Sequence, residues 1–90
     1  MNAVSFKKLR GVNLPEEKQG LIRYTCLTYP EQPRWVQNKI ERLCAEQGGF
    51  YTHALREVMC GTASIASIAQ RSHVDEKTLY ALRKAFYEAW

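Results

Sequence analysis

Prolines and glycines divide this chain into short segments, and within each segment the apolar residues recur at helical spacing. Residues 29–33 contain two prolines, so no continuous helix crosses them. Gly48, Gly49 and Gly61 mark two further ends, because glycine commonly follows the last turn of a helix. No segment alternates apolar and polar residues over five or more positions, as a half-buried strand does. The pattern predicts an all-α fold with about five short helices.

Three helices are expected in the first two thirds of the chain. The first covers about residues 14–27, with Asn13 as its cap, because asparagine before Leu-Pro-Glu is typical of a helix start. The second opens after Pro33 and reaches Gln47, and the third covers residues 50–60. The residues of the first helix expected to face inward are Leu14, Leu21 and Ile22, with Cys26 a further candidate.

The length of 90 residues fits one domain, and the shares of hydrophobic residues (46%) and charged residues (24%) are ordinary for a globular protein. We expect residues 13–90 to form a single helical domain, preceded by a basic N-terminal arm at residues 1–12. No run of about 18 apolar residues is present, so the sequence predicts no membrane span. The basic residues near the N-terminus are not followed by an apolar stretch, which argues against a signal peptide. The expected compartment is therefore the cytoplasm.

The formal net charge of +4 is mildly basic and favours an anionic partner only weakly. The charge is unevenly distributed, because Lys7, Lys8 and Arg10 give residues 1–13 a charge of +3 with no acidic residue among them. The sequence therefore predicts a flexible basic arm that could add phosphate contacts to a nucleic-acid complex.

The cysteine and histidine residues lack the neighbouring residues that a disulfide, a metal site or a catalytic site would need. Cys26, Cys44 and Cys60 are odd in number and far apart in sequence, which gives neither a disulfide framework nor a zinc site. We expect them to be reduced thiols of the core. Neither His53 nor His73 belongs to a recognisable ligand set, and no phosphate-binding loop or dinucleotide motif occurs. We therefore expect no catalytic residue, no metal and no cofactor.

The last thirty residues carry the pattern that two short helices need if they are to cross at a steep angle. Ala69 is small enough for the helices to approach closely, and residues 71–73 supply the turn. Val74 can close the turn from below, and Asp75 is a strong N-cap for the second helix. The residues expected to pack the two helices together are Ile65, Ile68, Leu79, Leu82 and Phe86. A helix-turn-helix is therefore predicted at about residues 62–88.

This string resembles the helix-turn-helix of bacterial regulators. The pattern Ile-Ala, four residues, Val, three residues, Thr-Leu-Tyr is similar to the motif of TetR-type repressors and, less closely, to that of sigma factor region 4. The matching residues are Ile68, Ala69, Val74, Thr78, Leu79, Tyr80 and Leu82. The resemblance covers about residues 62–86, with residues 53–60 as a preceding support helix. His73 departs from it, because this turn position usually holds glycine and typically needs a positive φ.

The resemblance implies that the second helix enters the major groove of DNA and that its first residues touch base edges. The candidate base readers are Lys77, Tyr80, Ala81 and Lys84. Lys77 could donate to guanine, Ala81 could touch a thymine methyl group, and Thr78 would contact a phosphate. The candidates for holding the DNA backbone from the first helix are Ser64, Ser67 and Gln70. The positions of the second helix expected to point outward are Glu76, Lys77, Tyr80, Ala81, Arg83, Lys84 and Tyr87.

We expect a small DNA-binding protein, a transcription regulator of bacterial, phage or plasmid type with double-stranded DNA as its partner. The alternative is a protein-interaction module, such as an adaptor to RNA polymerase or another protein, that keeps the helix-turn-helix for packing. The weak charge favours this alternative, as do the exposed-looking aromatic residues Trp35, Tyr51, Tyr87 and Trp90. RNA binding through the basic arm is a third reading, and the sequence holds no RNA-recognition pattern that supports it.

The apolar stripe of the last helix continues through Phe86 to Trp90. This extension would either pack against the helix of residues 33–47 or form a homodimer seam together with Trp35 or Tyr29. A homodimer would suit a palindromic DNA site, because the symmetry of such a site mirrors that of the protein.

Overall fold

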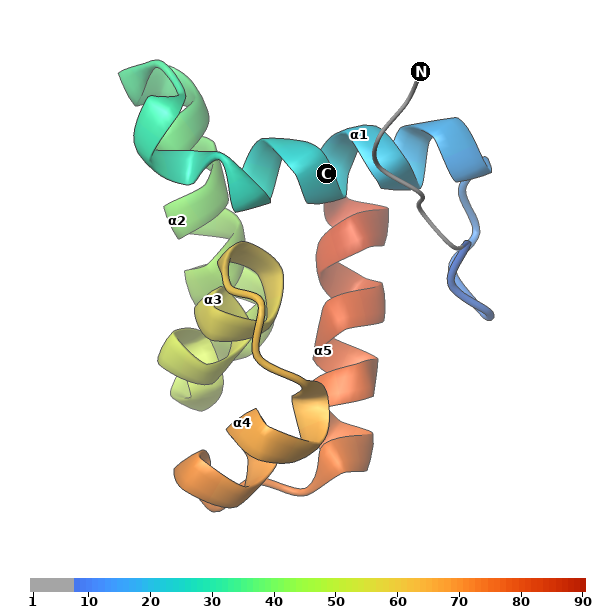
Figure 1. Cartoon of the computed structure of the whole chain (residues 1–90), viewed down its shortest axis with the longest axis vertical. Coiled ribbons are helices and arrows are strands. Elements are labelled where there is room, and N and C mark those ends of the chain that lie inside the picture. The colour runs from blue at the N-terminus through green and yellow to red at the C-terminus, as the bar shows by residue number, and fades with distance from the viewer. Residues whose placement is uncertain (1–7) are drawn as a thin grey trace.

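The computed structural model describes residues 8–90, which fold into five α-helices and two short 3₁₀ turns and contain no strand (Figure 1). The elements in chain order are α1 (Glu16–Leu27), η1 (Tyr29–Glu31), α2 (Arg34–Gly48), η2 (Gly49–Tyr51), α3 (Thr52–Cys60), α4 (Ile65–Ser72) and α5 (Glu76–Ala89). The predicted all-α fold and the number of helices are confirmed. None of the helices in this part of the chain combines the length and the apolar character that crossing a bilayer needs.

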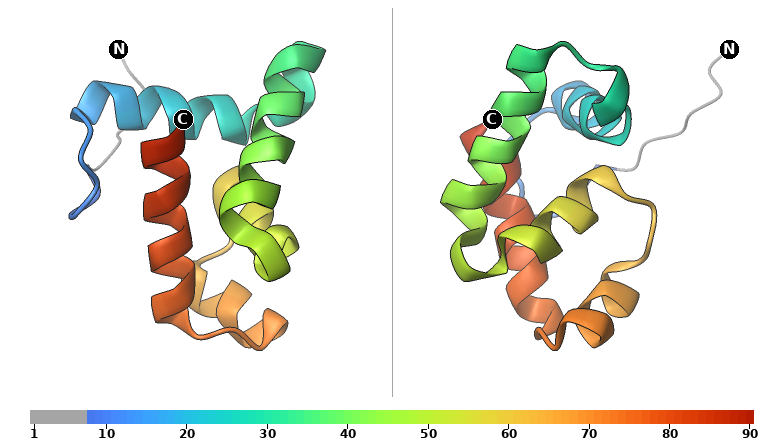
Figure 2. Two further views of the ribbon diagram at one scale, coloured as in Figure 1. Left: turned by 180° about the vertical axis from the view of Figure 1, so that it is seen from behind. Right: turned by 90° about the vertical axis from the view of Figure 1, so that its left-hand side faces the viewer.

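The short helix α3 is the centre of the packing. It contacts each of the other four α-helices. Its buried residues Ala54, Leu55, Val58 and Met59 follow helical spacing, so nine residues are enough to present an apolar face to several neighbours. Figure 1 and the views of Figure 2 show α2 and α5 on either side of α3, α1 lying across their upper ends, and α4 at the opposite end of the molecule. The α4–α5 corner is therefore far from α1.

Two helix starts follow the prolines rather than a capping side chain. Pro15 and Pro33 occupy the cap positions of α1 and α2, and neither helix start has a side-chain cap hydrogen bond. The predicted cap Asn13 is therefore wrong. Helix α1 begins only at Glu16, and the backbone N–H of Asn13 donates instead to Glu88 Oε2 of α5 at 3.0 Å. The loop before α1 is thus tied to the C-terminal end of α5.

The inward face of α1 is set by Ile22 and Cys26, which are fully buried. The prediction for Leu21 is wrong, because its side chain is 64% exposed. Successive residues of a helix lie about 100° apart, so burying Ile22 and Cys26 turns the neighbouring Leu21 away from the core. The apolar pattern of α1 has two sides, and only the packing of α3 beneath it decides which side is buried.

The chain ahead of α1 is held by a buried amide. Gln19 is fully buried, and its Oε1 accepts from the Leu9 backbone N–H at 2.9 Å. Its Nε2 donates to the carbonyl of Leu14 at 3.0 Å. Burying an amide is costly unless its donors and acceptor find partners, and here the loop supplies them. The segment from Leu9 to Leu14 therefore packs on α1.

A side chain of α1 completes the end of α3. Arg23 Nη1 donates to the carbonyls of Val58 and Met59, each at 2.7 Å, and Nη2 donates to the carbonyl of Gly61 at 3.0 Å. The last carbonyls of a helix have no partner within it, and charge-assisted donors satisfy them strongly. Helix α1 is joined in this way to the end of α3 by three hydrogen bonds from one guanidinium group.

The side chains of Phe86 and Trp90, near the end of the chain, pack on the rest of the molecule. The Phe86 and Trp90 rings lie 6.0 Å apart between centroids, and Lys39 Nζ of α2 lies 4.2 Å from the centroid of the Trp90 ring. Of the two readings of this stripe, packing on α2 is the one present in the structure. Of the other aromatic residues considered for a dimer seam, Tyr29 is half-buried and donates to Glu41, whereas Trp35 is 70% exposed.

Candidate nucleic-acid interface

Two capped helices are joined by a tight turn, and α4 with the start of α5 forms the end of the molecule opposite α1 (Figure 1). Helix α4 begins after Ser64, whose Oγ accepts from the Ser67 backbone N–H at 3.1 Å. Helix α5 begins after Asp75, whose Oδ1 accepts from the Lys77 backbone N–H at 3.3 Å. Each cap satisfies an amide that its helix leaves free, so both starts are fixed by the local sequence. The predicted cap Asp75 is confirmed.

The turn has the predicted left-handed residue. His73 has φ 56° and ψ 44°, and no other residue described by the structure, glycine apart, has a positive φ. The Val74 backbone N–H donates to the carbonyl of Ala69 at 3.0 Å, the six-to-one hydrogen bond of a helix end with a left-handed residue. Histidine tolerates this region better than most side chains, although glycine does so without strain. The departure at His73 therefore leaves the turn intact.

The inner faces of the two helices pack as predicted. Ile68, Leu79 and Phe86 are fully buried, and Ala69 is 6% exposed where α4 meets its neighbours. The residues that pack against this core while remaining partly exposed are Ile65, Val74 and Leu82. Because the apolar residues of α4 and α5 face the core, the opposite side of each helix does not take part in this packing.

The sequence-predicted contact residues lie on that outer side. On α5, Lys77, Tyr80, Ala81 and Lys84 are exposed, and Thr78 is half-buried. On α4, the exposed candidates are Ser64, Ser67 and Gln70. A shallow depression lies between α4 and the start of α5, and its lining residues are Ala66, Ala69, Gln70, Val74, Asp75 and Glu76. The structure therefore leaves these candidates at the surface, with Lys84 farther along α5 than the others.

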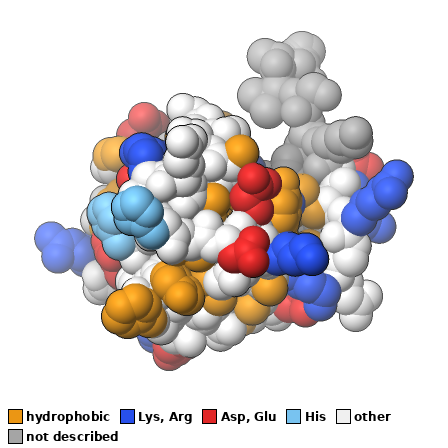
Figure 3. All heavy atoms as spheres, turned by 90° about the horizontal axis from the view of Figure 1, so that it is seen from below, with side chains coloured by type: hydrophobic (Ala, Val, Ile, Leu, Met, Phe, Trp, Pro, Cys, Tyr) orange, Lys and Arg blue, Asp and Glu red, His pale blue; other side chains and the backbone are white. Residues whose placement is uncertain are grey.

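The charge of this surface is mixed. Lys84 Nζ lies 3.0 Å from Glu88 Oε1, and Arg71 Nη1 lies 3.6 Å from Glu57 Oε2. Lys77 forms no ion pair within residues 8–90. Figure 3 shows this end of the molecule, where acidic side chains lie beside basic ones and hydrophobic side chains show between them. The positive charges of Arg71 and Lys84 are therefore partly offset by Glu57 and Glu88.

Two outward predictions for α5 need correction. Tyr87 is 2% exposed, so the prediction that it points outward is wrong, and burial raises the pKa of its hydroxyl. Arg83 is half-buried, with its guanidinium carbon 5.1 Å from the centroid of the Tyr80 ring, and burial lowers the pKa of Arg83. The C-terminal half of α5 is covered more than its own pattern indicates, because α2 and α3 both pack against it.

The basic arm does not join this surface in the part of the chain that the structure describes. Lys8 and Arg10 are exposed on the loop that Gln19 holds against α1. The loop is tied through Asn13 to Glu88 near the C-terminal end of α5, and Lys84 bonds the same carboxylate. Lys77, Thr78 and Tyr80 lie in the first turns of that helix. Lys7 lies outside the described residues.

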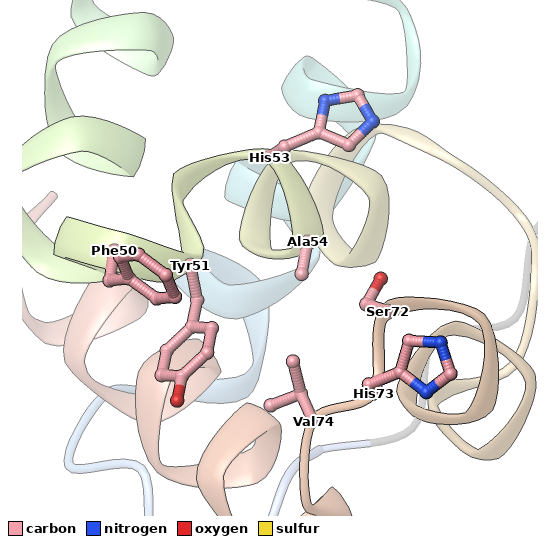
Figure 4. A pocket seen from close by; sticks show the side chains of 7 residues that line it. All are labelled: Phe50, Tyr51, His53, Ala54, Ser72, His73 and Val74. Atoms are coloured by element: carbon pink, nitrogen blue, oxygen red, sulfur yellow. The ribbon is translucent and has the colours of Figure 1, made fainter.

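A second hollow, of about 410 Å³, lies beside the turn and was missed by the sequence reasoning. Figure 4 shows its side chains coming from two segments, one around the start of α3 and one at the end of α4. Its lining residues are Phe50, Tyr51, His53, Ala54, Ser72, His73 and Val74. Phe50 is 95% exposed, and its ring meets that of Tyr51 edge-on at 5.4 Å between centroids. The sequence feature that could have indicated this hollow is the pair Phe50-Tyr51 directly after Gly48-Gly49, because two adjacent rings cannot both lie on one apolar face of a helix.

Residues 8–90 hold no cluster of three histidine, cysteine or acidic side chains arranged to bind a metal ion. His53 Nε2 lies 3.9 Å from Glu57 Oε2, but its side chain is 84% exposed, as in an ordinary surface pair. Comparisons with family models, with curated proteins and with solved structures find no match for this chain.

Proposed function

We propose that this chain is a small DNA-binding protein, a transcription regulator whose α5 helix enters the major groove. The observation that carries the proposal is the capped α4–turn–α5 corner. Its apolar stripe is buried, and its outer side presents Lys77, Tyr80 and Ala81 near the start of α5. The start of such a helix is the part that meets base edges in a helix-turn-helix complex.

In this proposal the two helices have different roles. Lys77 donates to a guanine edge and Ala81 contacts a thymine methyl group, while Thr78 binds a phosphate. Ser67 and Gln70 of α4 hold the backbone of the DNA. Lys84 exchanges its pairing with Glu88 for a phosphate oxygen. A homodimer on a palindromic site would double these contacts, which a single unit with so few free cations needs for tight binding.

The test is fluorescence anisotropy of labelled random-sequence duplex DNA, titrated with the protein at two salt concentrations. The double variant Lys77→Ala, Lys84→Ala is expected to raise Kd roughly tenfold or more and to flatten the salt dependence by about one unit of slope per lost phosphate contact. Circular dichroism checks that the variant stays folded, which is expected because both side chains are exposed.

The matched control removes the same charge elsewhere. Lys18 and Arg34 are exposed at the start of α1 and α2, and neither takes part in an ion pair among residues 8–90. Lys18→Ala, Arg34→Ala is expected to change Kd only slightly. If both double variants lose the same affinity for DNA, the binding reflects only the overall charge of the protein. If the α5 variant binds DNA as well as the parent, α5 is not the helix that contacts the bases.

A second candidate function is a protein-interaction module that contacts RNA polymerase or another protein. The observation that favours it is the exposure of large aromatic side chains, 95% for Phe50 and 70% for Trp35. Such a surface would bind its partner with little salt dependence, whereas DNA binding weakens steeply with salt. An absence of DNA binding even at low salt would favour this candidate, with Phe50→Ala as the first variant to test.

A further inference from the structure

Arg83 of α5 is held against an aromatic ring and has no acidic partner. The next residue, Lys84, pairs with Glu88 at 3.0 Å, but Arg83 takes part in no ion pair within residues 8–90. Its guanidinium carbon lies 5.1 Å from the centroid of the Tyr80 ring, which is within the range of a cation–π contact. The ring therefore orients the side chain of Arg83 while its charge stays without a counter-ion from this part of the chain.

The side chain of Arg83 has lost part of its hydration. The residue is half-buried, and burial lowers the pKa of its guanidinium group. Because a buried charge is costly unless it is paired, an anion that meets the guanidinium would offset part of this cost. A guanidinium group presents its N–H donors in one plane, and this geometry matches two oxygens of a phosphate. The Tyr80 ring already restricts the long side chain, so less side-chain entropy would be lost on binding.

Arg83 and Tyr80 lie on one flank of α5, between its buried side and its outer side. Successive residues of a helix are about 100° apart, so these two residues are separated by about 60° around the helix axis. The exposure of the side chains follows the same order, because Leu79 is fully buried, Arg83 is half-buried and Tyr80 is exposed. Lys77 comes next around the helix and is exposed. The cation and its ring therefore border the face that carries the proposed base contacts.

We propose that Arg83, supported by the Tyr80 ring, binds a phosphate of the DNA backbone at the edge of the major groove. This inference rests on the proposed function, in which α5 enters that groove. A helix with its side chains is about 10–12 Å across and the major groove is about 12 Å wide, so the flanks of the helix face the two sugar-phosphate backbones. A phosphate contact fixes how the protein sits on the duplex and carries no sequence information of its own. Tyr80 is in this account a positioning residue, which acts through Arg83.

The experiment measures the Kd of the full-length protein for two labelled DNA duplexes of unrelated sequence, by anisotropy at several salt concentrations. Arg83→Gln is expected to raise Kd about tenfold on both duplexes, because a charge-assisted contact is lost whatever the bases are. The slope of log Kd against log salt is expected to fall by about one unit, the effect of one phosphate contact. The matched control is Arg34→Gln on α2, an exposed arginine without an ion pair among residues 8–90, which is expected to change neither quantity.

Two further variants separate the charge of Arg83 from its orientation. Arg83→Lys keeps the charge but loses the planar group, so the salt slope is expected to stay while Kd rises. Tyr80→Leu removes the ring and is expected to weaken binding in the parent protein, and to have little further effect in the Arg83→Gln background. Thermal melting by circular dichroism checks that each variant is folded. If Arg83→Gln does not fold, Arg83→Lys decides the test, and a Kd equal to that of the parent overturns the proposal.

The outcomes distinguish this inference from the proposed function. If the parent protein binds neither duplex at the lowest salt concentration, the proposed function fails and this inference fails with it. If the parent binds DNA with a steep salt dependence and Arg83→Gln matches Arg34→Gln in Kd and slope, only this inference is overturned. A loss confined to one duplex would place Arg83 at a base edge and overturn the phosphate assignment. Additive losses from Tyr80→Leu and Arg83→Gln would show that the ring does not act through Arg83.

Discussion

The two ends of the chain build their helices in different ways. Helices α4 and α5 each start with a side-chain cap, Ser64 and Asp75. Helices α1 and α2 each start after a proline, with no side-chain cap hydrogen bond. A cap satisfies the first amides from within the segment, whereas a proline fixes only the entry angle of the chain. The C-terminal corner is thus specified locally, and the N-terminal pair depends more on what it packs against.

The outer faces differ as well. On α1 the side turned away from the core carries Leu21 and Tyr24, which are 64% and 57% exposed. On α5 the corresponding side carries Lys77 and Lys84. The outer face of α5 can be predicted from the sequence, because that helix has one apolar stripe. Helix α1 has two apolar sides, and the helices that pack against it determine which side is buried. The comparison shows where single-helix patterns suffice and where they fail.

The strongest way to break this comparison is to truncate one leucine in each half. Leu79→Ala removes a fully buried side chain of α5 and is expected to lower the free energy of unfolding by about 2–5 kcal/mol. Leu21→Ala removes an exposed side chain of α1 and is expected to change it by less than about 0.5 kcal/mol. Urea unfolding followed by circular dichroism measures both. Comparable losses would mean that the outer face of α1 is covered in solution.

A smaller effect separates the two kinds of helix start. Asp75→Ala removes the cap of α5 and is expected to lower the free energy of unfolding by about 1 kcal/mol. Asn13→Ala is the matched change before α1, and because only the Asn13 backbone N–H is used, we expect a change below about 0.5 kcal/mol. The same urea unfolding measurement applies. A loss at Asn13 as large as at Asp75 would restore asparagine as a cap.

The smallest effect concerns the tie between the two halves. The Asn13 backbone N–H and Lys84 both donate to Glu88, which lowers the pKa of that carboxyl below its ordinary value of 4.5. Because the pKa of Glu88 is lowered in the folded protein, the stabilisation from these hydrogen bonds is fully present above the ordinary pKa of the carboxyl. It is lost as the pH falls through the lowered pKa and the carboxylate is protonated. The ¹⁵N shift of the Asn13 amide should titrate with that low midpoint. In Glu88→Gln this titration should vanish, and its persistence would place the contact elsewhere.

The local features of the C-terminal corner were predictable. The positive φ of His73, the cap at Asp75 and the burial of Ala69 follow from turn and cap chemistry within a few residues. The pairing of Lys84 with Glu88 was readable too, as an (i, i+4) pair, and was overlooked. DNA binding by this corner stays a prediction.

The features that failed prediction depend on distant parts of the chain. Tyr87 is buried because α2 and α3 cover α5 from two sides, which the pattern of α5 does not record. The exposure of Leu21 likewise depends on which side of α1 packs against its neighbours.

Because Arg23 belongs to α1, the C-terminal helices would lose hydrogen bonds if they were separated from the first half of the chain. A fragment of residues 49–90 would keep α3, α4 and α5 but would strip the carbonyls of Val58, Met59 and Gly61 of their donor. The end of α3, against which α4 and α5 pack, therefore depends on a side chain of the first helix. A fragment that keeps α3 would need a replacement cation at the end of that helix to satisfy these carbonyls.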